Sequence, residues 1–396
     1  MKTNITLFAQ IIKSLSITVF NNLVQKYQTD KHSKGFNSWT HLITMLFCQF
    51  SNLNSLRDII NGLQSLQGDL NHLVIQKAPK RSTLSYQNEH RDWRLFQSFY
   101  YEMLERLTSI AQFKQIKFKI KSKIYLLDST TISLCLSIFD WAKFRRRKGA
   151  IKLHTLLDYD SCLPTYIDMT EGKVNDAKAA KNIVLPPDSV VVADRAYVDF
   201  DTMNKWHKNS SYFVVRFKKS IKYKKLSEKE LPKDRHQHIL IDELIELSEE
   251  KTKAKYPRKL RRVVVYDETM EEAIEIITNQ MTWTANTIGE LYKSRWQIEI
   301  FFKEIKQLLK IKTFLGTSQN AVLIQIWTAM ISILIYKYLK ACSKINWNLS
   351  NLVASLRLNL IVKINLRKLL DKEFCNIADP PNNNLNYQYQ LFKWGD

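Results

Sequence analysis

The sequence predicts an α/β protein in which a mixed sheet follows an all-helical amino-terminal domain. Three observations predict this class. Apolar residues recur at helical spacing through residues 1–115, short apolar runs alternate with helical segments through residues 123–217, and residues 218–280 read mainly as β-structure. With 396 residues, of which 45% are hydrophobic, the chain can bury a large core and form two or three domains.

The amino-terminal region is predicted to be a compact helical module, because no strand-like alternation interrupts it and polar connections join its segments. Helical spacing extends over residues 7–27, 39–50, 53–66 and 92–114.

The central region begins with a predicted buried strand, KIYLLDSTTISL at residues 123–134, which carries Asp128. The next expected elements, in chain order, are a basic loop at 142–149, strands at 150–160 and 163–172, a helix capped by Asn175, a strand at 189–197 that carries Asp194, a helix at 199–208 and a strand at 211–217. This order is that of a mixed sheet, and the ribonuclease-H-like fold has it. Function must then be argued from the site.

The predicted domains follow from these patterns. They are a helical domain at 1–115, a ribonuclease-H-like domain at 120–345 with a lysine-containing β-rich insertion at about 218–280, and a helical carboxyl-terminal segment and tail at 346–396.

The charge of the chain indicates a polyanionic partner. The sequence has 60 Lys and Arg against 38 Asp and Glu, which gives a net charge of +22 and a pI near 9.6. Nucleic acid is the first candidate for the partner, and the alternative is a soluble basic protein without one.

A cytoplasmic location is expected. The five cysteines are scattered and form no CxxC pair, which argues against a zinc site and a disulfide framework. Gln10 and Lys13 interrupt the first apolar run, so no signal peptide is expected. Residues 317–336 are long enough to span a bilayer, but Gln325 and the lack of a second span favour a buried core helix.

The stretch LYKSRWQIEIFFKEIKQLL at residues 291–309 combines an apolar helix face with a narrow polar strip. On a regular helix Tyr292, Arg295, Glu299 and Lys306 share a strip about 60° wide. One interpretation is a solvated helix edge with an Arg295–Glu299 ion pair. The other is a functional surface.

Three carboxylates favour the functional interpretation. Asp128 and Asp194 interrupt or end buried strands, where a charge is costly unless it is paired or binds a metal. Each alone could be a turn or cap residue. The first and fourth strands of the predicted sheet are neighbours, and a helix packed on them could add Glu299. Such an oxygen site suits Mg²⁺ or Mn²⁺, and two ions can promote phosphodiester cleavage.

Several basic and polar residues could complete this site. Arg295 and Lys306 could bind phosphates, and Tyr292 could donate to a phosphate or stack on a base. The run Arg145, Arg146 and Arg147 is either a solvated loop or a DNA contact close to Asp128. Three further residues are predicted to have no catalytic role. Glu304 lies off the strip, and Asp176 is a turn or cap residue. His154 is structural, because no nearby residue would form a catalytic base or metal-ligand pair with it.

The spacing Tyr292–x2–Arg295–x3–Glu299–x6–Lys306 resembles the Tyr-Arg-Glu-Lys signature of DDE transposases in the insertion-sequence-four family. The resemblance covers most of the chain, from DKHSKGFNSWTHL and SYQNEHRDW near the amino terminus through LLDST, KGAIKLHTLLDYD and VVADRAYVDF to the signature itself. It implies that Asp128 and Asp194, with the signature glutamate, hold two Mg²⁺ or Mn²⁺ ions.

The resemblance also implies the partners and the reaction. The remaining signature residues would contact DNA, and the amino-terminal helices would form a DNA-binding module. The family excises an element at its terminal inverted repeats within a dimeric synapse, often through a hairpin, and joins it to target DNA. A bacterial protein associated with the nucleoid is therefore expected. Two alternatives are a nuclease of the same fold without strand transfer and a catalytically silent DNA-binding derivative.

Overall fold

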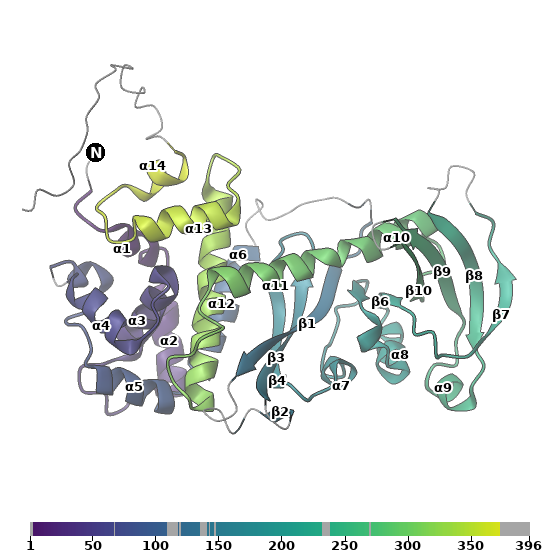
Figure 1. Cartoon of the computed structure of the whole chain (residues 1–396), viewed down its shortest axis with the longest axis horizontal. Helices are drawn as coiled ribbons and strands as arrows, with labels where there is room; N and C mark the ends of the chain where they lie inside the picture. The colour runs from purple at the N-terminus through teal and green to yellow at the C-terminus, as the bar shows by residue number, and fades with distance from the viewer. Residues whose placement is uncertain are drawn as a thin grey trace, which may run out of the picture.

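The computed structural model describes residues 3–66, 68–108, 118, 120–134, 141, 143–145, 148–231, 238–268 and 271–372. The molecule is elongated: helices of the amino-terminal region lie at one end, a large mixed sheet occupies the middle, and its outermost strands form the other end (Figure 1). The long helical run of α10 and α11 crosses the sheet, and α12 stands between the sheet and the amino-terminal helices (Figure 1).

The helices of the amino-terminal region are α1 (Leu7–Ile12), α2 (Ile17–Tyr27), α3 (Ser38–Ser51), α4 (Leu56–Gln64), the 3₁₀ helix η1 (Leu70–Leu73), α5 (Arg81–His90) and α6 (Arg94–Thr108). The expected single segment at 7–27 is two helices. The reason is Ser16, whose side chain accepts a hydrogen bond from the Val19 amide and caps α2.

The carboxyl-terminal helices are α12 (Gln319–Cys342), α13 (Leu349–Leu358) and α14 (Leu366–Leu370). Within the described part of the chain, α12 alone is long and apolar enough to cross a membrane, yet 89% of its most apolar window is buried inside the protein. It packs against α3, α5, α6 and α13. The Gln325 side chain is satisfied there, because it donates to the Lys310 and Thr313 carbonyls and accepts from the Leu315 amide at 2.8–2.9 Å. This is the buried core helix that the sequence predicted.

One hydrophobic core therefore joins regions far apart in the sequence. It contains side chains of α1 to α6 together with α10 to α13 and one face of the sheet. The predicted boundary near residue 115 separates the amino-terminal helices from the rest in sequence but not in packing.

The strands are β1 (Ile124–Leu134), β2 (Lys143–Arg145), β3 (Lys148–Asp158), β4 (Pro164–Glu171), β5 (Val190–Ala193), β6 (Tyr212–Arg216), β7 (Tyr223–Glu228), β8 (Ile239–Leu247), β9 (Leu260–Asp267) and β10 (Glu272–Thr278). They form one sheet in the order β2-β3-β1-β5-β6-β10-β9-β8-β7, with β4 also paired to β3. β1 is antiparallel to β3 and parallel to β5, which is parallel to β6. The mixed α/β class is confirmed.

The remaining helical segments are α7 (Asp176–Ala180), the 3₁₀ helix η3 (Arg195–Tyr197), α8 (Phe200–Lys208), α9 (Glu250–Lys255), α10 (Ala285–Ser294) and α11 (Trp296–Leu308).

One expectation about the sheet needs correction. The basic segment expected as a loop at 142–149 contains β2, which pairs with the start of β3. The β-rich insertion is continuous with the main sheet, because β10 pairs antiparallel with β6. Inside it, the buried Arg261 guanidinium makes two hydrogen bonds to Asp242, at 2.6 and 2.8 Å, so the buried charges compensate each other.

Side chains of β1 alternate between two cores, as a strand requires. Leu126 belongs to the core covered by α10 to α12, whereas Leu127 belongs to a second core with α7 and α8. By this alternation Asp128 falls on the α11 face and Ser129 on the α7 face.

Candidate active site

Residues 291–309 form two helices in place of the single regular one that the spacing predicted. α10 ends at Ser294 and α11 begins at Trp296, while Arg295 between them keeps right-handed helical backbone angles (φ −51°, ψ −30°). Here the Arg295 amide donates to the Tyr292 carbonyl and the Ile298 amide to the Arg295 carbonyl, both at 3.1 Å. Such i→i+3 bonds tighten the helix locally, so angles from a uniform wheel do not carry across Arg295.

Asp128 and Asp194 are neighbours at adjacent strands. Leu127 of β1 is paired with Ala193 of β5 in a parallel register, and the two aspartates follow these residues directly. α11 packs against β1 and brings Glu299 to the same face. The expected adjacency of the first and fourth strands is confirmed.

Arg295 links two of the three carboxylates. Its Nη2 lies 2.7 Å from Glu299 Oε1, and its Nη1 donates to Asp128 Oδ2 at 3.5 Å. The guanidinium also lies 5.9 Å from the ring centre of Tyr292. The Arg295 side chain is only 14% exposed, and its partner on β1 is 167 residues away. The polar strip is therefore an interior contact at this point, and the solvated-edge interpretation is wrong for Arg295.

The carboxylates influence one another electrostatically. The pKa of Asp128 is raised from 3.8 to about 6, mainly by burial and to a smaller extent by the negative charges of Glu299 and Asp194. The Ser129 amide, which donates to Asp128 Oδ1 at 2.8 Å, and the Arg295 guanidinium act in the opposite direction. Asp128, Asp194 and Glu299 thus form an anionic cluster, and Arg295 is its positive partner.

Tyr292 is 7% exposed and lies beneath this cluster. Burial raises the pKa of its hydroxyl, Arg295 lowers it, and the charge of Asp194 raises it. Arg216, at the end of β6, is close enough to lower the same pKa and forms a 2.8 Å ion pair with Glu272. Sequence reasoning missed Arg216, because nothing in its local pattern distinguishes it from other strand-end residues.

The donor set suits a hard divalent cation, since it consists of carboxylate oxygens. Asp128, Asp194 and Glu299 come from three separate elements, and two of them share Arg295. In the described ranges no three His, Cys, Asp or Glu side chains are grouped closely enough to hold a metal ion in this arrangement. By their chemistry the three carboxylates would suit Mg²⁺ or Mn²⁺, but in this arrangement the Arg295 guanidinium is the positive group that joins Asp128 to Glu299.

A second polar cluster lies behind Asp128, on the other face of β1. Ser129 Oγ donates to Asp176 Oδ1 at 2.6 Å, and Lys152 Nζ donates to Asp176 Oδ2 at 3.2 Å. His154 Nδ1 lies 3.5 Å from Asp176 Oδ1, and its other ring nitrogen contacts Thr170 Oγ1 at 2.9 Å.

Two interpretations from the sequence are corrected by this cluster. Asp176 is not a cap: Asn175 caps α7 by accepting from the Ala177 amide, as predicted. His154 does have a nearby partner, contrary to expectation. The β1–β3 register pairs Ser129 with His154, and both side chains lie against Asp176 of α7. The sequence does not specify that register.

The other predicted DNA-contacting residues are more distant from the cluster or lack a described side chain. Lys306 is half-buried on α11, and burial, together with the charge of Lys312, lowers its pKa. Among the described residues no ion pair joins Lys306 to the three carboxylates. Arg145 lies in β2, where only its backbone is described, and Arg146 and Arg147 lie outside the described residues.

Glu304 points away from the cluster. Its carboxylate lies 3.8 Å from Lys337 Nζ of α12, as expected for a residue off the polar strip.

Known proteins share sequence with this chain in the same region. The "Putative transposase y4zB" of Sinorhizobium fredii is 31% identical over 234 residues, which cover 59% of this chain and 64% of that protein. The chain thus matches just under two thirds of this relative's length. The "Probable transposase for insertion sequence element IS5377" of Geobacillus stearothermophilus is 26% identical over 255 residues, covering 63% and 67% of the two chains. The "Putative transposase for insertion sequence element IS4SA" of Synechocystis is 25% identical over 261 residues, covering 65% and 71%.

Two family models match the chain. A domain of unknown function (DUF4372) matches residues 3–76, which contain α1 to α4. The model of the Transposase DDE domain matches residues 119–335, from the start of the sheet into α12. This match covers more than half of the chain, and the chain therefore belongs to the DDE transposase family.

Proposed function

We propose that this protein is a transposase of the insertion-sequence-four family. In this proposal it binds the terminal inverted repeats of an insertion sequence, cleaves DNA phosphodiester bonds there and joins the ends to target DNA. The observation that carries the proposal is that Asp128 and Asp194 lie on paired strands while Arg295 joins Asp128 to Glu299. These side chains come from three elements separated by up to 171 residues, and a purely structural ion pair would need only two of them.

The strand arrangement supports a ribonuclease-H-like assignment for the central domain. β4, β3 and β1 are successive antiparallel neighbours, and β1, β5 and β6 are parallel. This is the order that the sequence pattern led us to expect for that fold.

The DDE family implies the use of divalent metal ions, and the three carboxylates would hold them here. Two bound Mg²⁺ or Mn²⁺ ions would activate a water and stabilise the leaving oxygen of the cleaved bond. Ser129 orients Asp128 by donating its amide to Oδ1, and Asp176 fixes Ser129 in turn.

Arg295 has two tasks in this proposal. It balances the negative charge of Asp128 and Glu299, and its planar fork matches a phosphate, to which it can donate two hydrogen bonds. The buried Tyr292 ring has little free surface on which a base could stack, so we assign it to the support of Arg295.

Lys306 is the second phosphate contact of the proposal. It is close to Lys312, and both the neighbouring charge and burial disfavour its charged form. A DNA phosphate near these two ammonium groups would remove that repulsion. Arg145, Arg146 and Arg147 are proposed to contact the same DNA, and the net charge of +22 would draw it to the protein.

The partners in this proposal are duplex DNA, at both the inverted-repeat ends and the target, and a second copy of the chain in the synapse. The amino-terminal helices are the proposed DNA-binding region, and a cytoplasmic, nucleoid-associated location would follow from the DNA partner.

The test uses purified protein, Mg²⁺, a duplex that carries the element's end, and a target plasmid. Asp194→Ala and Glu299→Ala should abolish cleavage but keep binding, because they remove a metal ligand and no phosphate contact. Glu304→Ala is the matched control, since its residue lies on the same helix and contacts Lys337. Near-normal cleavage by Glu299→Ala would refute the assignment of the site.

Two further arms separate the alternatives. Joined products in the target plasmid distinguish a transposase from a nuclease without strand transfer. Lys306→Gln should cut cleavage at least tenfold, because a charge-assisted phosphate contact also positions the reacting group, whereas Lys303→Gln on the exposed side of α11 should not.

A further inference from the structure

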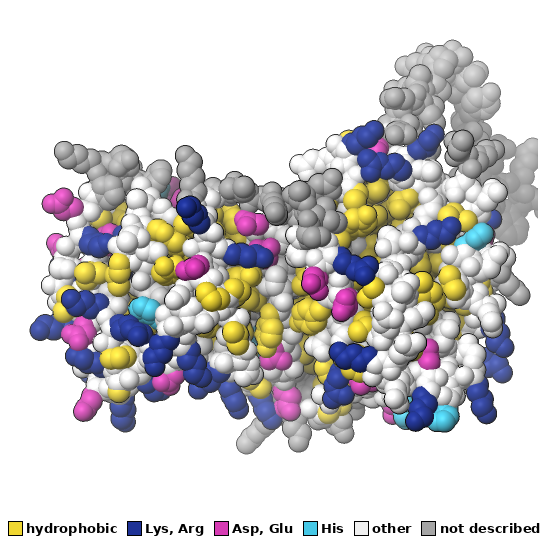
Figure 2. Space-filling view, turned by 180° about the vertical axis from the view of Figure 1, so that it is seen from behind, with side chains coloured by type: hydrophobic (Ala, Val, Ile, Leu, Met, Phe, Trp, Pro, Cys, Tyr) yellow, Lys and Arg dark blue, Asp and Glu magenta, His cyan; other side chains and the backbone are white. Residues whose placement is uncertain are grey.

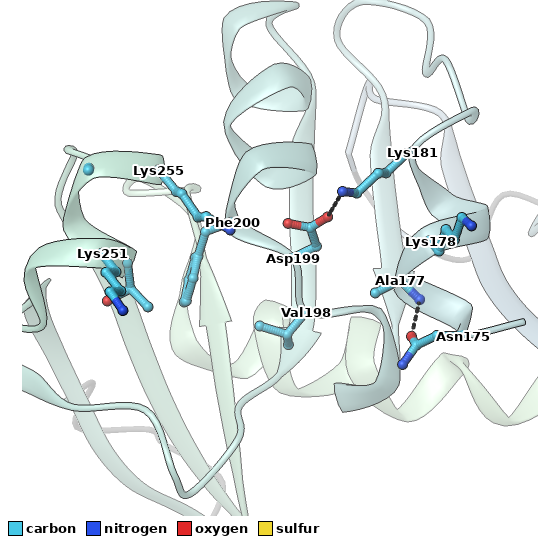
Figure 3. A pocket seen from close by; sticks show the side chains of 11 residues that line it. Asn175, Ala177, Lys178, Lys181, Val198, Asp199, Phe200, Lys251 and Lys255 are labelled. Carbon is cyan, nitrogen blue, oxygen red and sulfur yellow. Dashed lines mark hydrogen bonds and ion pairs between the residues drawn. The ribbon is translucent and has the colours of Figure 1, made fainter.

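A lysine-lined groove lies between the main sheet and the insertion. Its volume is about 840 Å³, and its walls are α7 on one side and α9 on the other. Figure 3 shows Lys178 and Lys181 on the α7 side, Lys251 and Lys255 on the α9 side, and Val198 between them.

The groove is strongly positive. Of its 11 lining residues four are lysines and one, Asp199, is acidic. The Asp199 carboxylate already has partners, because it caps α8 and lies 3.5 Å from Lys181 Nζ. Lys255 forms an ion pair with Asp201 at 3.2 Å. Lys178 and Lys251 are exposed and form no ion pair with any described residue.

Lysine side chains of this kind suit a phosphate backbone. The floor contains Val198 and Phe200, which are almost fully buried, so the aliphatic stems can lie along apolar surface while the ammonium groups reach outward. The rear view shows Lys and Arg gathered along the lower edge of the half that carries the insertion, where α8 and α9 lie (Figure 2). Positive charge thus continues beyond the groove.

The groove is connected to the candidate active site by two short segments. Val198 follows Asp194 by four residues, a distance that the chain can span over at most about 14 Å. On the α7 wall, Asn175 precedes Asp176, whose carboxylate holds Ser129 beside Asp128. Since phosphates on one strand rise about 3.4 Å per step, the end of the groove at Val198 lies at most about four phosphates from a bond held at Asp194.

We infer that this groove binds the backbone of the duplex that is cleaved, about half a helical turn from the scissile phosphate. The inference rests on the proposed function and extends it, because it gives the insertion a DNA contact through α9. The occupant is the DNA continuous with the reacting strand, since the floor of the groove follows Asp194 closely in the chain and its α7 wall contains Asp176. A separate target duplex has no such link to the site.

The test compares the parent protein with the double variant Lys178→Gln and Lys251→Gln. Its matched control is Lys205→Gln with Lys208→Gln, which removes two exposed lysines from the opposite end of α8. The probe is a duplex of roughly 40 base pairs, or about four helical turns, that spans the junction of the terminal repeat and the flanking DNA. Shorter versions are trimmed stepwise toward the cleavage position from either side.

The groove variant should bind the full duplex about tenfold more weakly than the parent, with a salt slope smaller by about two, because two phosphate contacts are lost. Trimming one side to within about four base pairs of the cut should abolish this difference, because the parent then loses the same contacts. The control should bind like the parent at every length.

Each other outcome overturns the inference in a different way. Equal binding by the parent and the groove variant at all lengths would mean that the groove contacts no DNA. Normal cleavage and binding with impaired joining would assign the groove to target DNA. A parent protein that neither binds nor cuts the element's end would refute the proposed function as well.

Discussion

Ionisation of Asp128 should destabilise the metal-free protein as the pH rises from about 4 to about 6. The Asp128 side chain is 21% exposed, and burial raises its pKa from 3.8 to about 6. In the unfolded chain the carboxyl ionises near 3.8, whereas in the folded protein it holds its proton until about pH 6. Below about pH 3 both states are protonated and no cost arises. Above pH 6 both are ionised, and the folded state bears the full cost.

The size of this cost follows from the two pKa values. Each tenfold change in a proton equilibrium corresponds to about 1.4 kcal/mol, so a pKa raised from 3.8 to about 6 corresponds to about 3 kcal/mol at neutral pH. Asp128→Asn keeps the shape of the side chain and cannot ionise. Its free energy of unfolding relative to the parent should therefore rise by about 2 kcal/mol between pH 4 and pH 7, because part of the full difference is already present at pH 4.

Urea denaturation of both proteins in a chelator, at one-unit pH intervals, measures this difference. A parallel series in saturating Mg²⁺ should shrink the difference at pH 7, because a cation bound to the ionised carboxylates stabilises the folded parent. Parallel stability curves for the two proteins from pH 4 to pH 7 in the chelator would refute the reasoning. They would mean that Asp128 is as well solvated in the folded state as in the unfolded one.

Two further predictions test the surroundings of the site. Asp176→Asn should lower the cleavage rate constant at least tenfold without changing DNA affinity, because Ser129 loses its charged acceptor; single-turnover kinetics and a binding titration separate the two effects. Arg261→Met should cost about 3–5 kcal/mol in urea denaturation, since it leaves the 4%-exposed Asp242 carboxylate buried without its partner. The double variant Arg261→Met with Asp242→Leu should recover most of that loss.

The sequence predicted the parts of the fold that depend on local pattern. The first four residues of β1 and the whole of β5 are apolar runs, and their continuous burial follows from their position inside a covered parallel pair. From the order of strands alone, their adjacency and the meeting of Asp128 and Asp194 could be expected. The apolar run of α12 could likewise be predicted to be a core helix and not a membrane span, because its Gln325 needs polar partners, which it has inside the protein.

Features that depend on long-range register could not be predicted. The pairing of β10 with β6 joins the insertion to the main sheet across about 60 residues, and neither strand carries a signal for its partner. The irregular turn at Arg295 has no Pro or Gly to announce it. Asp176 looked like a helix-start residue because its partners, Ser129 and Lys152, come from strands far earlier in the chain.

The charges of the site and of the whole chain act in opposite directions on DNA. The net charge of +22 would attract a DNA duplex to the protein as a whole. At the candidate active site, however, a single guanidinium contacts two carboxylates and the third, Asp194, lies beside Asp128, so a phosphate approaching Asp128 would be repelled unless more positive charge were present. Lys306 and the groove lysines lie outside this cluster and can hold the duplex without neutralising it. Binding should therefore respond mainly to salt, and cleavage to the divalent cation that supplies the missing charge between the carboxylates and the phosphate.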